Sequence, residues 1–318
     1  MTGSRGNILA LCGGVGGAKL ALGLVQALPP ARLGIVVKTG DDFAHLDLTI
    51  CPDLDTVIYT LAGEAHPATG WGRADETWDF MQSLAEKGGP TWFRLGDKDL
   101  TLHVHRQDLL DQGRSLSEVT ADIARRFHVD VPVYPMTDDP VRTVVETADG
   151  PLTFQHYFVR DRCAPQVTGV RFDGAPEAQP SPGFAAALAD WELGAVVICP
   201  SNPFVSIDPI LAVGDVQARL GALEVPVIAV SPLVGGEAIK GPTAKMMDEL
   251  GLPRTVEGIA DHYGDLIDGL VIDTADAASA DGLRARGLKV HVCNTVMRTR
   301  EDRIALAEAC LRFAKVAI

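Results

Sequence analysis

The sequence predicts an α/β protein built on a doubly wound parallel sheet, with a second lobe of mixed α+β structure inserted into it. Three observations predict this fold class. An apolar, strand-like run leads into glycines and a helix near the start; strand-like and helical patterns alternate towards both ends; and the middle of the chain has a different, hairpin-like pattern. The length of 318 residues also exceeds the usual size of one hydrophobic core. We therefore assign residues 1–71 and 186–318 to the core and residues 72–185 to the inserted lobe.

The first predicted strand runs into a glycine-rich stretch. Residues Ile8–Cys12 are apolar, and the apolar positions from Leu20 to Leu28 have helical spacing. Between them lie four glycines and a lysine, Gly13, Gly14, Gly16, Gly17 and Lys19. Glycine permits a close approach of the backbone, and the N–H groups at a helix start favour an anion. The stretch predicts a phosphate-binding loop of a Rossmann-like core, but its spacing matches neither G-x-G-x-x-G nor Walker A, so a glycine turn without a ligand is the alternative.

Polar residues follow the second predicted strand, Leu33–Val37. Thr39, Asp41 and Asp42 come directly after it, at the position where open α/β sheets bind ligands. The adjacent carboxylates repel each other unless a cation or hydrogen-bond donors lie between them. Oxygen ligands of this kind suit Mg²⁺, so the segment indicates a magnesium site.

Two further aspartates, Asp53 and Asp55, lie in a segment that Pro52 stiffens, just before a helix-like run over residues 57–62. They bring the number of carboxylates within fifteen residues to four, which strengthens the prediction of a bound cation. The alternative for one of the two is that its side chain caps the following helix.

The inserted lobe begins with helical, loop-rich sequence. Mixed charge at residues 96–99 is followed by the basic side chains of His103, His105 and Arg106. In an acidic protein this cluster is a candidate for anion binding opposite the glycine loop. The alternative is a solvated helix start that Asp97 caps.

The rest of the inserted lobe contains a predicted helix and strands. Ser115 and Glu118 have the spacing of a capping box before a helix that ends near residue 127. Strands are predicted at residues 131–134, 141–146, 152–156 and 170–172. Residues 147–150 form the turn between the second and third of these strands.

The core resumes with strand-like runs that begin at residues 195, 225, 270 and 290, and the last predicted helix covers residues 300–314. Small polar residues follow several of these strands, at Ser201, Asn202, Ser231 and residues 294–295. Hydroxyls and amides can hold a base, a ribose or a phosphate without adding charge. Each residue alone is typical of a turn, but together with the glycine loop they predict a nucleotide site.

The composition excludes some classes of partner. Twenty-eight basic and 42 acidic residues give a net charge of −14, which argues against non-specific binding to nucleic acid or to anionic membranes. The six cysteines form no C-x-x-C pair, so neither a zinc site nor disulfides are expected. With no signal region and no membrane-spanning run, the cytoplasm is the expected location.

Eight stretches, in this order, resemble motifs of the 2-phospho-L-lactate transferase (CofD) family. They are Gly13–Lys19, Thr39–Asp42, Ile50–Thr56, Gly70–Gly72, Leu95–Asp99, Pro135–Pro140, Pro200–Pro203 and Ser231–Pro232. The resemblance implies a Rossmann-like fold with an added lobe, dependence on Mg²⁺, a homodimer and a step in the synthesis of the deazaflavin coenzyme F-420. In that step the terminal ribityl hydroxyl of the deazaflavin Fo attacks the phosphorus of a guanosine-diphospho-linked three-carbon acid, and GMP leaves.

The resemblance also implies roles for individual residues. The loop Gly13–Gly17 holds the diphosphate, Ser201 and Asn202 contact the guanosine nucleotide, and Asp55 and Lys98 contact Fo. Lys19, Thr39 and Ser231 complete the predicted binding residues. The candidate metal ligands are Asp41, Asp42 and Asp53. We expect Asp53 or Asp55 to orient the Fo hydroxyl, with the proton removed late, because phosphoryl transfer needs mainly positioning and charge neutralisation.

One residue departs from the family pattern, since Lys38 stands where members often have asparagine. A cation there would offset phosphate or carboxylate charge and bear on which acid is accepted; a surface lysine without a role is the alternative. The sequence leaves open whether that acid is 2-phospholactate, phosphoenolpyruvate or 3-phosphoglycerate.

Two other functions compete with the transferase. The first is a non-catalytic, nucleotide-sugar-binding regulator of the gluconeogenesis-factor type, which shares a glycine-rich opening. The Asp53/Asp55 pair, Trp71 and residues 96–99 favour the transferase. The second is a nicotinamide dehydrogenase, in which Asp41 or Asp42 would bind ribose, but the glycine spacing does not fit it.

Overall fold

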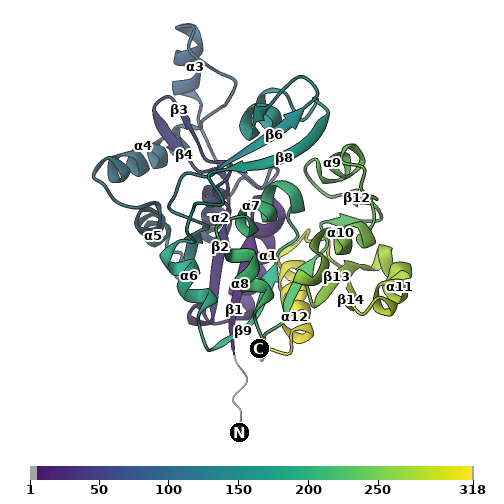
Figure 1. Ribbon diagram of the computed structural model, residues 1–318. Coiled ribbons are helices and arrows are strands. Elements are labelled where there is room, and N and C mark those ends of the chain that lie inside the picture. Colours follow the sequence, from purple (N-terminus) through teal and green to yellow (C-terminus); the bar gives the residue numbers. More distant parts are fainter. Residues whose placement is uncertain (1–5, 317–318) are drawn as a thin grey trace.

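The computed structural model describes residues 6–316 and has a seven-stranded sheet at its centre (Figure 1). In spatial order the strands are β14 (Lys289–Cys293), β13 (Gly269–Asp273), β10 (Val227–Val230), β9 (Leu193–Ile198), β1 (Asn7–Cys12), β2 (Leu33–Val37) and β5 (Val133–Pro135). All neighbouring strands are parallel. The chain starts in the middle of the sheet, builds outward through β2 to β5, and returns to β9 to build the other half. This order confirms the predicted doubly wound fold.

Helices cover both faces of the sheet because its strands bury both sets of alternating side chains. In β1, Leu9 and Leu11 belong to one hydrophobic core, and Ile8 and Ala10 belong to the other. The first core is closed by α6 (Pro182–Leu188), α7 (Asp208–Leu211), α8 (Val216–Gly221) and α10 (Val256–Tyr263). The second core is closed by α1 (Gly14–Ala27), α2 (Pro52–Ala62) and α12 (Arg300–Phe313).

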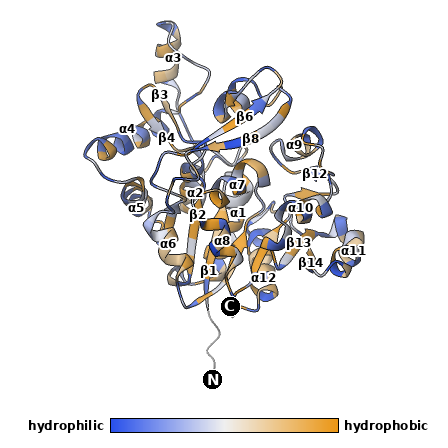
Figure 2. Cartoon of the chain, viewed as in Figure 1, coloured by the Kyte–Doolittle hydropathy of each residue, from blue (hydrophilic) through white to orange (hydrophobic). Residues whose placement is uncertain are grey.

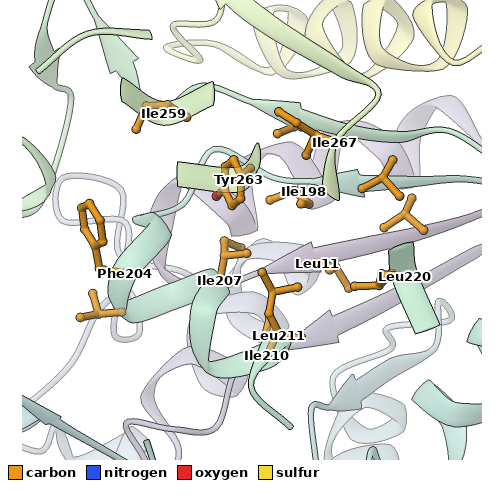
Figure 3. Packing of buried hydrophobic residues seen from close by; sticks show 14 of the residues in the cluster. Leu11, Ile198, Phe204, Ile207, Ile210, Leu211, Leu220, Ile259, Tyr263 and Ile267 are labelled. Carbon is orange, nitrogen blue, oxygen red and sulfur yellow. The ribbon is translucent and has the colours of Figure 1, made fainter. Parts of the chain in front are cut away.

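The first core is continuous from the strands to the outer helices. Figure 3 shows Leu11 and Ile198, at the ends of β1 and β9, packed beside Ile207 and Ile210 of the segment that follows β9. Tyr263 of α10 belongs to the same cluster. The central strands are accordingly coloured mostly as apolar in Figure 2, whereas outer helices such as α4 (Asp97–Asp111) carry polar faces. The apolar packing fixes the strand ends from which the candidate site is built.

The remaining elements lie outside the main sheet. The small antiparallel sheets are β3 (Phe43–His45) with β4 (Leu48–Ile50), β11 (Leu233–Val234) with β12 (Glu237–Ala238), and β7 (Leu152–Thr153) with β6 (Arg142–Thr147) and β8 (Val167–Asp173). The further helices and turns are α3 (Asp79–Glu86), α5 (Leu116–Arg126), α9 (Thr243–Glu249), α11 (Ala280–Ala285), η1 (Pro30–Arg32), η2 (His156–Arg160), η3 (Pro203–Ile207), η4 (Gly264–Leu266) and η5 (Thr274–Ser279). Within residues 6–316, no helix has both the length and the apolar character needed to cross a membrane.

The structure resolves the predicted inserted lobe into two kinds of segment. Val133–Pro135 pairs with β2 at the edge of the main sheet, so the chain returns to the core within residues 72–185. The predicted hairpin is confirmed, since β6 pairs antiparallel with β7 across the turn at residues 147–150. The strand predicted at residues 152–156 is shorter, because it ends at Thr153 and a helical turn over His156–Arg160 follows.

Two of the capping predictions have opposite outcomes. The box formed by Ser115 and Glu118 is present at the start of α5. The alternative that Asp53 or Asp55 caps the following helix is wrong, because α2 begins at Pro52 and no side chain bonds its first N–H groups from the N-cap position. Both carboxylates are buried in the first turn of α2 and make the longer-range contacts described below.

Candidate functional site

The glycine-rich stretch lies where the sheet changes its direction of growth, between β1 and β9. Gly13 follows β1, and Ser201 follows β9. The Ser201 hydroxyl donates a 2.8 Å hydrogen bond to the carbonyl oxygen of Gly13 and accepts a 3.3 Å bond from the Gly13 N–H. Ligands of open α/β sheets bind at such a switch point. The structure thus joins two predicted binding residues that are 188 positions apart in the chain.

The glycines form the first turn of α1 instead of a separate turn before it. Gly13 is the N-cap residue, and Gly14 opens the helix with a φ of +65°. A Cβ atom at Gly16 would lie 2.2 Å from the carbonyl oxygen of Pro200, and one at Gly17 would lie 2.8 Å from Ser201 Oγ. Glycine therefore lets α1 start directly against the loop after β9. The N–H groups of this turn have no partners within the helix and suit an anion.

A buried group of charged side chains adjoins the start of α1. Asp53 accepts a hydrogen bond from the Gly14 N–H, and its other oxygen lies 3.4 Å from Lys38 Nζ. Lys38 also forms an ion pair with Asp41 and donates a 2.8 Å hydrogen bond to the carbonyl oxygen of Val205. The Lys38 side chain is 3% exposed, so the alternative of a surface lysine is wrong.

Burial and pairing set the protonation of this group. Burial alone lowers the pKa of Lys38, but the carboxylates of Asp41 and Asp53 outweigh it and raise that pKa above its ordinary value. Lys38 is therefore a permanently charged ammonium at neutral pH. Burial raises the pKa of Asp42 well above its ordinary value. Burial also raises the pKa of Asp41, to about 7, although the ammonium of Lys38 opposes this effect.

The predicted metal ligands do not converge on one point. Lys38 Nζ contacts both Asp41 and Asp53, whereas Asp42 interacts with the thiol of Cys51. Asp41 and Asp42 each have a buried oxygen that accepts no hydrogen bond, but residues 6–316 contain no group of three or more His, Cys, Asp or Glu side chains that could hold a metal ion. The side chains therefore do not fit a resident ion held by all three aspartates, and Mg²⁺ stays a prediction from the family resemblance.

Asp55 is directed away from the glycine loop. It lies two positions after Asp53 in α2, which places the two side chains on different sides of the helix. Both its oxygens accept hydrogen bonds from Arg106, one of them at 3.2 Å. Burial raises the pKa of Asp55, and the Arg106 guanidinium opposes this effect. Of the two predicted catalytic carboxylates, only Asp53 contacts the glycine loop.

The basic residues that were candidates for anion binding are paired with carboxylates instead. Arg106 binds Asp55, and His105 Nε2 lies 3.0 Å from an oxygen of Asp122. His103 lies between two carboxylates. Its Nδ1 atom is 3.8 Å from Oδ2 of Asp55, and its Nε2 atom is 3.6 Å from Oδ2 of Asp99. These basic side chains therefore act as counterions of buried or half-buried carboxylates. Asp99 belongs to the same helix, but Asp55 and Asp122 come from α2 and α5, which local sequence does not reveal.

The helix start at residues 97–99 is capped by a different residue than predicted. Asp97 does not cap its own helix; it accepts hydrogen bonds from the N–H groups of Asp79 and Phe80 and so caps α3. Glu76 in turn accepts hydrogen bonds from the N–H groups of Lys98 and Asp99 at the start of α4. The two helix starts therefore cap each other across the lobe.

The other predicted binding residues are tied to backbone groups. Lys19 Nζ donates a 3.2 Å hydrogen bond to the carbonyl oxygen of Met297, and Lys98 Nζ donates a 3.4 Å bond to that of Ala74. Burial, together with Lys240 and Arg303, lowers the pKa of Lys19. Neither lysine contacts the group around Asp53.

The polar residues after the later strands shape turns. Asn202 accepts hydrogen bonds from two N–H groups of η3, the shorter at 2.9 Å. The Ser231 hydroxyl bonds the backbone of Leu233, and the carbonyl of Thr39 accepts a hydrogen bond from the Asp42 N–H. Among these strand-end residues, Ser201 alone bridges to the glycine loop through its side chain.

An aromatic cluster adjoins the acidic loop after β2, and the sequence analysis did not identify it. Its members are Phe43, His45, Trp92, Phe93 and His156. The ring centres of Phe43 and Phe93 are 4.8 Å apart, as are those of Trp92 and His156. All except His45 are partly exposed. Several separate segments supply these rings, so no local pattern predicts the cluster.

Comparison with known proteins identifies the family. Residues 8–309 match the family model described as 2-phospho-L-lactate transferase CofD. The chain is 40% identical over 315 residues to a phosphoenolpyruvate transferase of Kitasatospora aureofaciens, with 97% of this chain and 98% of the relative covered. It is 38% identical over 312 residues to a 2-phospho-L-lactate transferase of Methanopyrus kandleri, with 97% of each chain covered.

A solved structure shows the same fold. It is the crystal structure of a upf0052-family protein from Bacillus halodurans, which matches with a TM-score of 0.64 over 96% of this chain and 98% of that one. At 16% identity the similarity concerns the fold alone. The family model and the relatives, in contrast, match in sequence over nearly the whole length. The chain therefore belongs to the 2-phospho-L-lactate transferase CofD family, a family of transferases in coenzyme F-420 biosynthesis.

Proposed function

We propose that this transferase moves a phospho-three-carbon-acid group from its guanosine-diphospho donor to the terminal hydroxyl of the deazaflavin Fo, with release of GMP. The observation that carries the proposal is the contact between the start of α1 and the acidic segments, in which Gly14, Asp53 and Lys38 meet at the switch point of the sheet. Anion-binding backbone N–H groups thus lie directly beside a carboxylate that can receive a hydroxyl hydrogen bond.

The donor is expected to bind with its diphosphate at the first turn of α1. The N–H groups there and the positive end of the helix dipole stabilise the phosphate charge, and the charge that develops on the leaving GMP. Ser201 supports this binding by fixing Gly13 from the neighbouring strand end. The family resemblance implies Mg²⁺, whose charge would offset that of the diphosphate, but the steps below depend only on the residues of this chain.

The acceptor is expected to bind on the other side of Asp53. The partly exposed rings of Phe43, Trp92 and Phe93, which are tilted against one another, offer aromatic contacts for a deazaflavin ring. Gln155 ties the segment that carries His156 to the acidic loop through a 3.2 Å hydrogen bond to the carbonyl oxygen of Asp41. Fo bound there would direct its ribityl chain toward the carboxylates.

The reaction itself requires alignment above all. The Fo hydroxyl oxygen forms a bond to the phosphorus that carries the three-carbon acid, and the bond from that phosphorus to the oxygen of GMP breaks. Asp53 orients the hydroxyl and accepts its proton late in the step. Asp55, held by Arg106, acts by fixing α2 and α4 relative to each other.

A transfer assay tests this proposal. The purified protein is incubated with Fo and Mg²⁺ and, separately, with the guanosine-diphospho derivatives of 2-phospholactate, phosphoenolpyruvate and 3-phosphoglycerate. We expect a coenzyme product, identified by its mass, with at least one donor, and the donor that reacts names the acid. If folded protein gives no product with any donor and binds a nucleotide sugar tightly, the proposal is wrong and the regulator is the better interpretation.

A further inference from the structure

We infer that Lys38 is the resident cation of the acidic group, and that its ammonium occupies the place between Asp41 and Asp53 that a divalent ion would otherwise take. The consequence is that this protein holds no divalent ion at these two carboxylates while the glycine loop is free of donor. The inference concerns the site of the proposed reaction, but its test uses a metal ion alone and does not depend on the transfer activity.

Lys38 Nζ donates two hydrogen bonds and forms one longer ion pair. An ammonium group has three N–H donors. Three acceptors surround Lys38 Nζ: the carboxylate of Asp41, the carbonyl oxygen of Val205 at 2.8 Å and the carboxylate of Asp53 at 3.4 Å. The ring of Phe154 covers the ammonium, with its centre 4.7 Å from Nζ. These contacts hold the ammonium of Lys38 in one position.

The surrounding backbone fixes the same position. A Cβ atom added to Gly13 would lie 3.0 Å from Cγ of Lys38, so the aliphatic part of the lysine packs against the glycine loop. Lys38 directly follows β2, at the carboxyl end of the strand. It is buried there, so water screens its charge little. A second cation placed between the same two carboxylates would have to enter this space against the repulsion of the ammonium.

The charge balance explains why the lysine is needed. Two carboxylates that share one buried site cannot both be ionised without a counterion. With the lysine in place, Asp53 has a counterion and accepts the hydrogen bond from the Gly14 N–H, which is the geometry that the proposed reaction uses. Lys38 is thus a positioning residue, because it acts through Asp53.

Binding of Mn²⁺ in the absence of nucleotide tests the inference, with electron paramagnetic resonance to count bound ions. We expect the wild type to bind no ion at this site. Lys38→Met removes the ammonium and is expected to create one Mn²⁺ site, at least about tenfold tighter than any binding by the wild type (a tenfold change corresponds to about 1.4 kcal/mol). Adding Asp41→Asn to Lys38→Met should abolish the new site.

Two control variants separate this effect from a general loss of positive charge. Lys38→Arg keeps a cation in place and should bind no Mn²⁺, and Lys289→Met removes an exposed lysine elsewhere and should behave as the wild type does. Tight Mn²⁺ binding by the wild type that Asp41→Asn weakens would overturn the inference, as would a folded Lys38→Met protein that gains no site. If Lys38→Met does not fold, the comparison of the wild type with Asp41→Asn decides alone: equal, weak binding supports the resident lysine.

Discussion

Asp53→Asn is expected to lower kcat of the transfer reaction by about 100- to 10,000-fold, the range typical of a lost general base. Asparagine has nearly the same shape as aspartate and can still accept the hydrogen bond from the Gly14 N–H, so the glycine loop should keep its geometry. What the variant lacks is the negative charge that orients the Fo hydroxyl and receives its proton. Binding of GDP, measured by calorimetry without Mg²⁺, should be unchanged or tighter, because a negative charge beside the phosphates is gone.

Two variants serve as controls for this experiment. Asp215→Asn changes an exposed carboxylate that makes no capping bond, and it should leave kcat unchanged. Asp55→Asn removes the partner of Arg106 and should act first on stability. If Asp53→Asn and Asp55→Asn both retained near-wild-type turnover, neither carboxylate would have the proposed role.

Arg106→Met is expected to cost about 3–5 kcal/mol of folding free energy at neutral pH, because it leaves the buried carboxylate of Asp55 without its bidentate partner. Arg106 is 1% exposed and Asp55 is 5% exposed, so water cannot replace the guanidinium. Urea denaturation measures the loss. The double variant Arg106→Met/Asp55→Asn should recover part of it, because a neutral amide no longer requires a counterion.

The cost of Arg106→Met should depend on pH with a definite sign. Burial raises the pKa of Asp55 even with Arg106 present, and the loss of the guanidinium raises it further. The folded variant therefore binds a proton that the unfolded chain has already released, so its stability falls as the pH rises. The deficit relative to the wild type should be larger at pH 8 than at pH 5; a deficit that is equal at both values, or larger at pH 5, would show that Asp55 is not its cause.

Local sequence patterns predict the elements of this fold well, because periodicity and caps act over short distances. The strand at Ile8–Cys12, the glycine-started helix and the box of Ser115 and Glu118 all form where the pattern indicates. The place of Val133–Pro135 at the edge of the main sheet, in contrast, could not be predicted from local sequence. Its pairing with β2 depends on tertiary contacts, and a short strand in a loop-rich segment does not indicate in its own sequence which strand it pairs with.

The sequence predicts only part of the site. Residues in local motifs are predicted, whereas contacts between residues far apart in the sequence are not. The glycine loop, Ser201 and Asp53 are found from local motifs and meet in the structure. The partners of the charged residues are not predictable in this way. Lys38 and Asp55 both obtain partners from segments that only the fold brings close, Val205 for the first and Arg106 for the second. From the sequence alone, a basic side chain is therefore equally compatible with binding an anion and with pairing to a distant carboxylate.

A crystal structure of the protein with GDP tests most directly whether the start of α1 holds the donor. We expect a phosphate oxygen at hydrogen-bond distance, about 2.9 Å, from the Gly14 N–H. The carboxylate of Asp53 should then have left that N–H and remain beside Lys38. If GDP instead binds elsewhere and the hydrogen bond between Gly14 and Asp53 stays intact, the glycine loop is not the diphosphate site and the proposed arrangement of donor and acceptor is wrong.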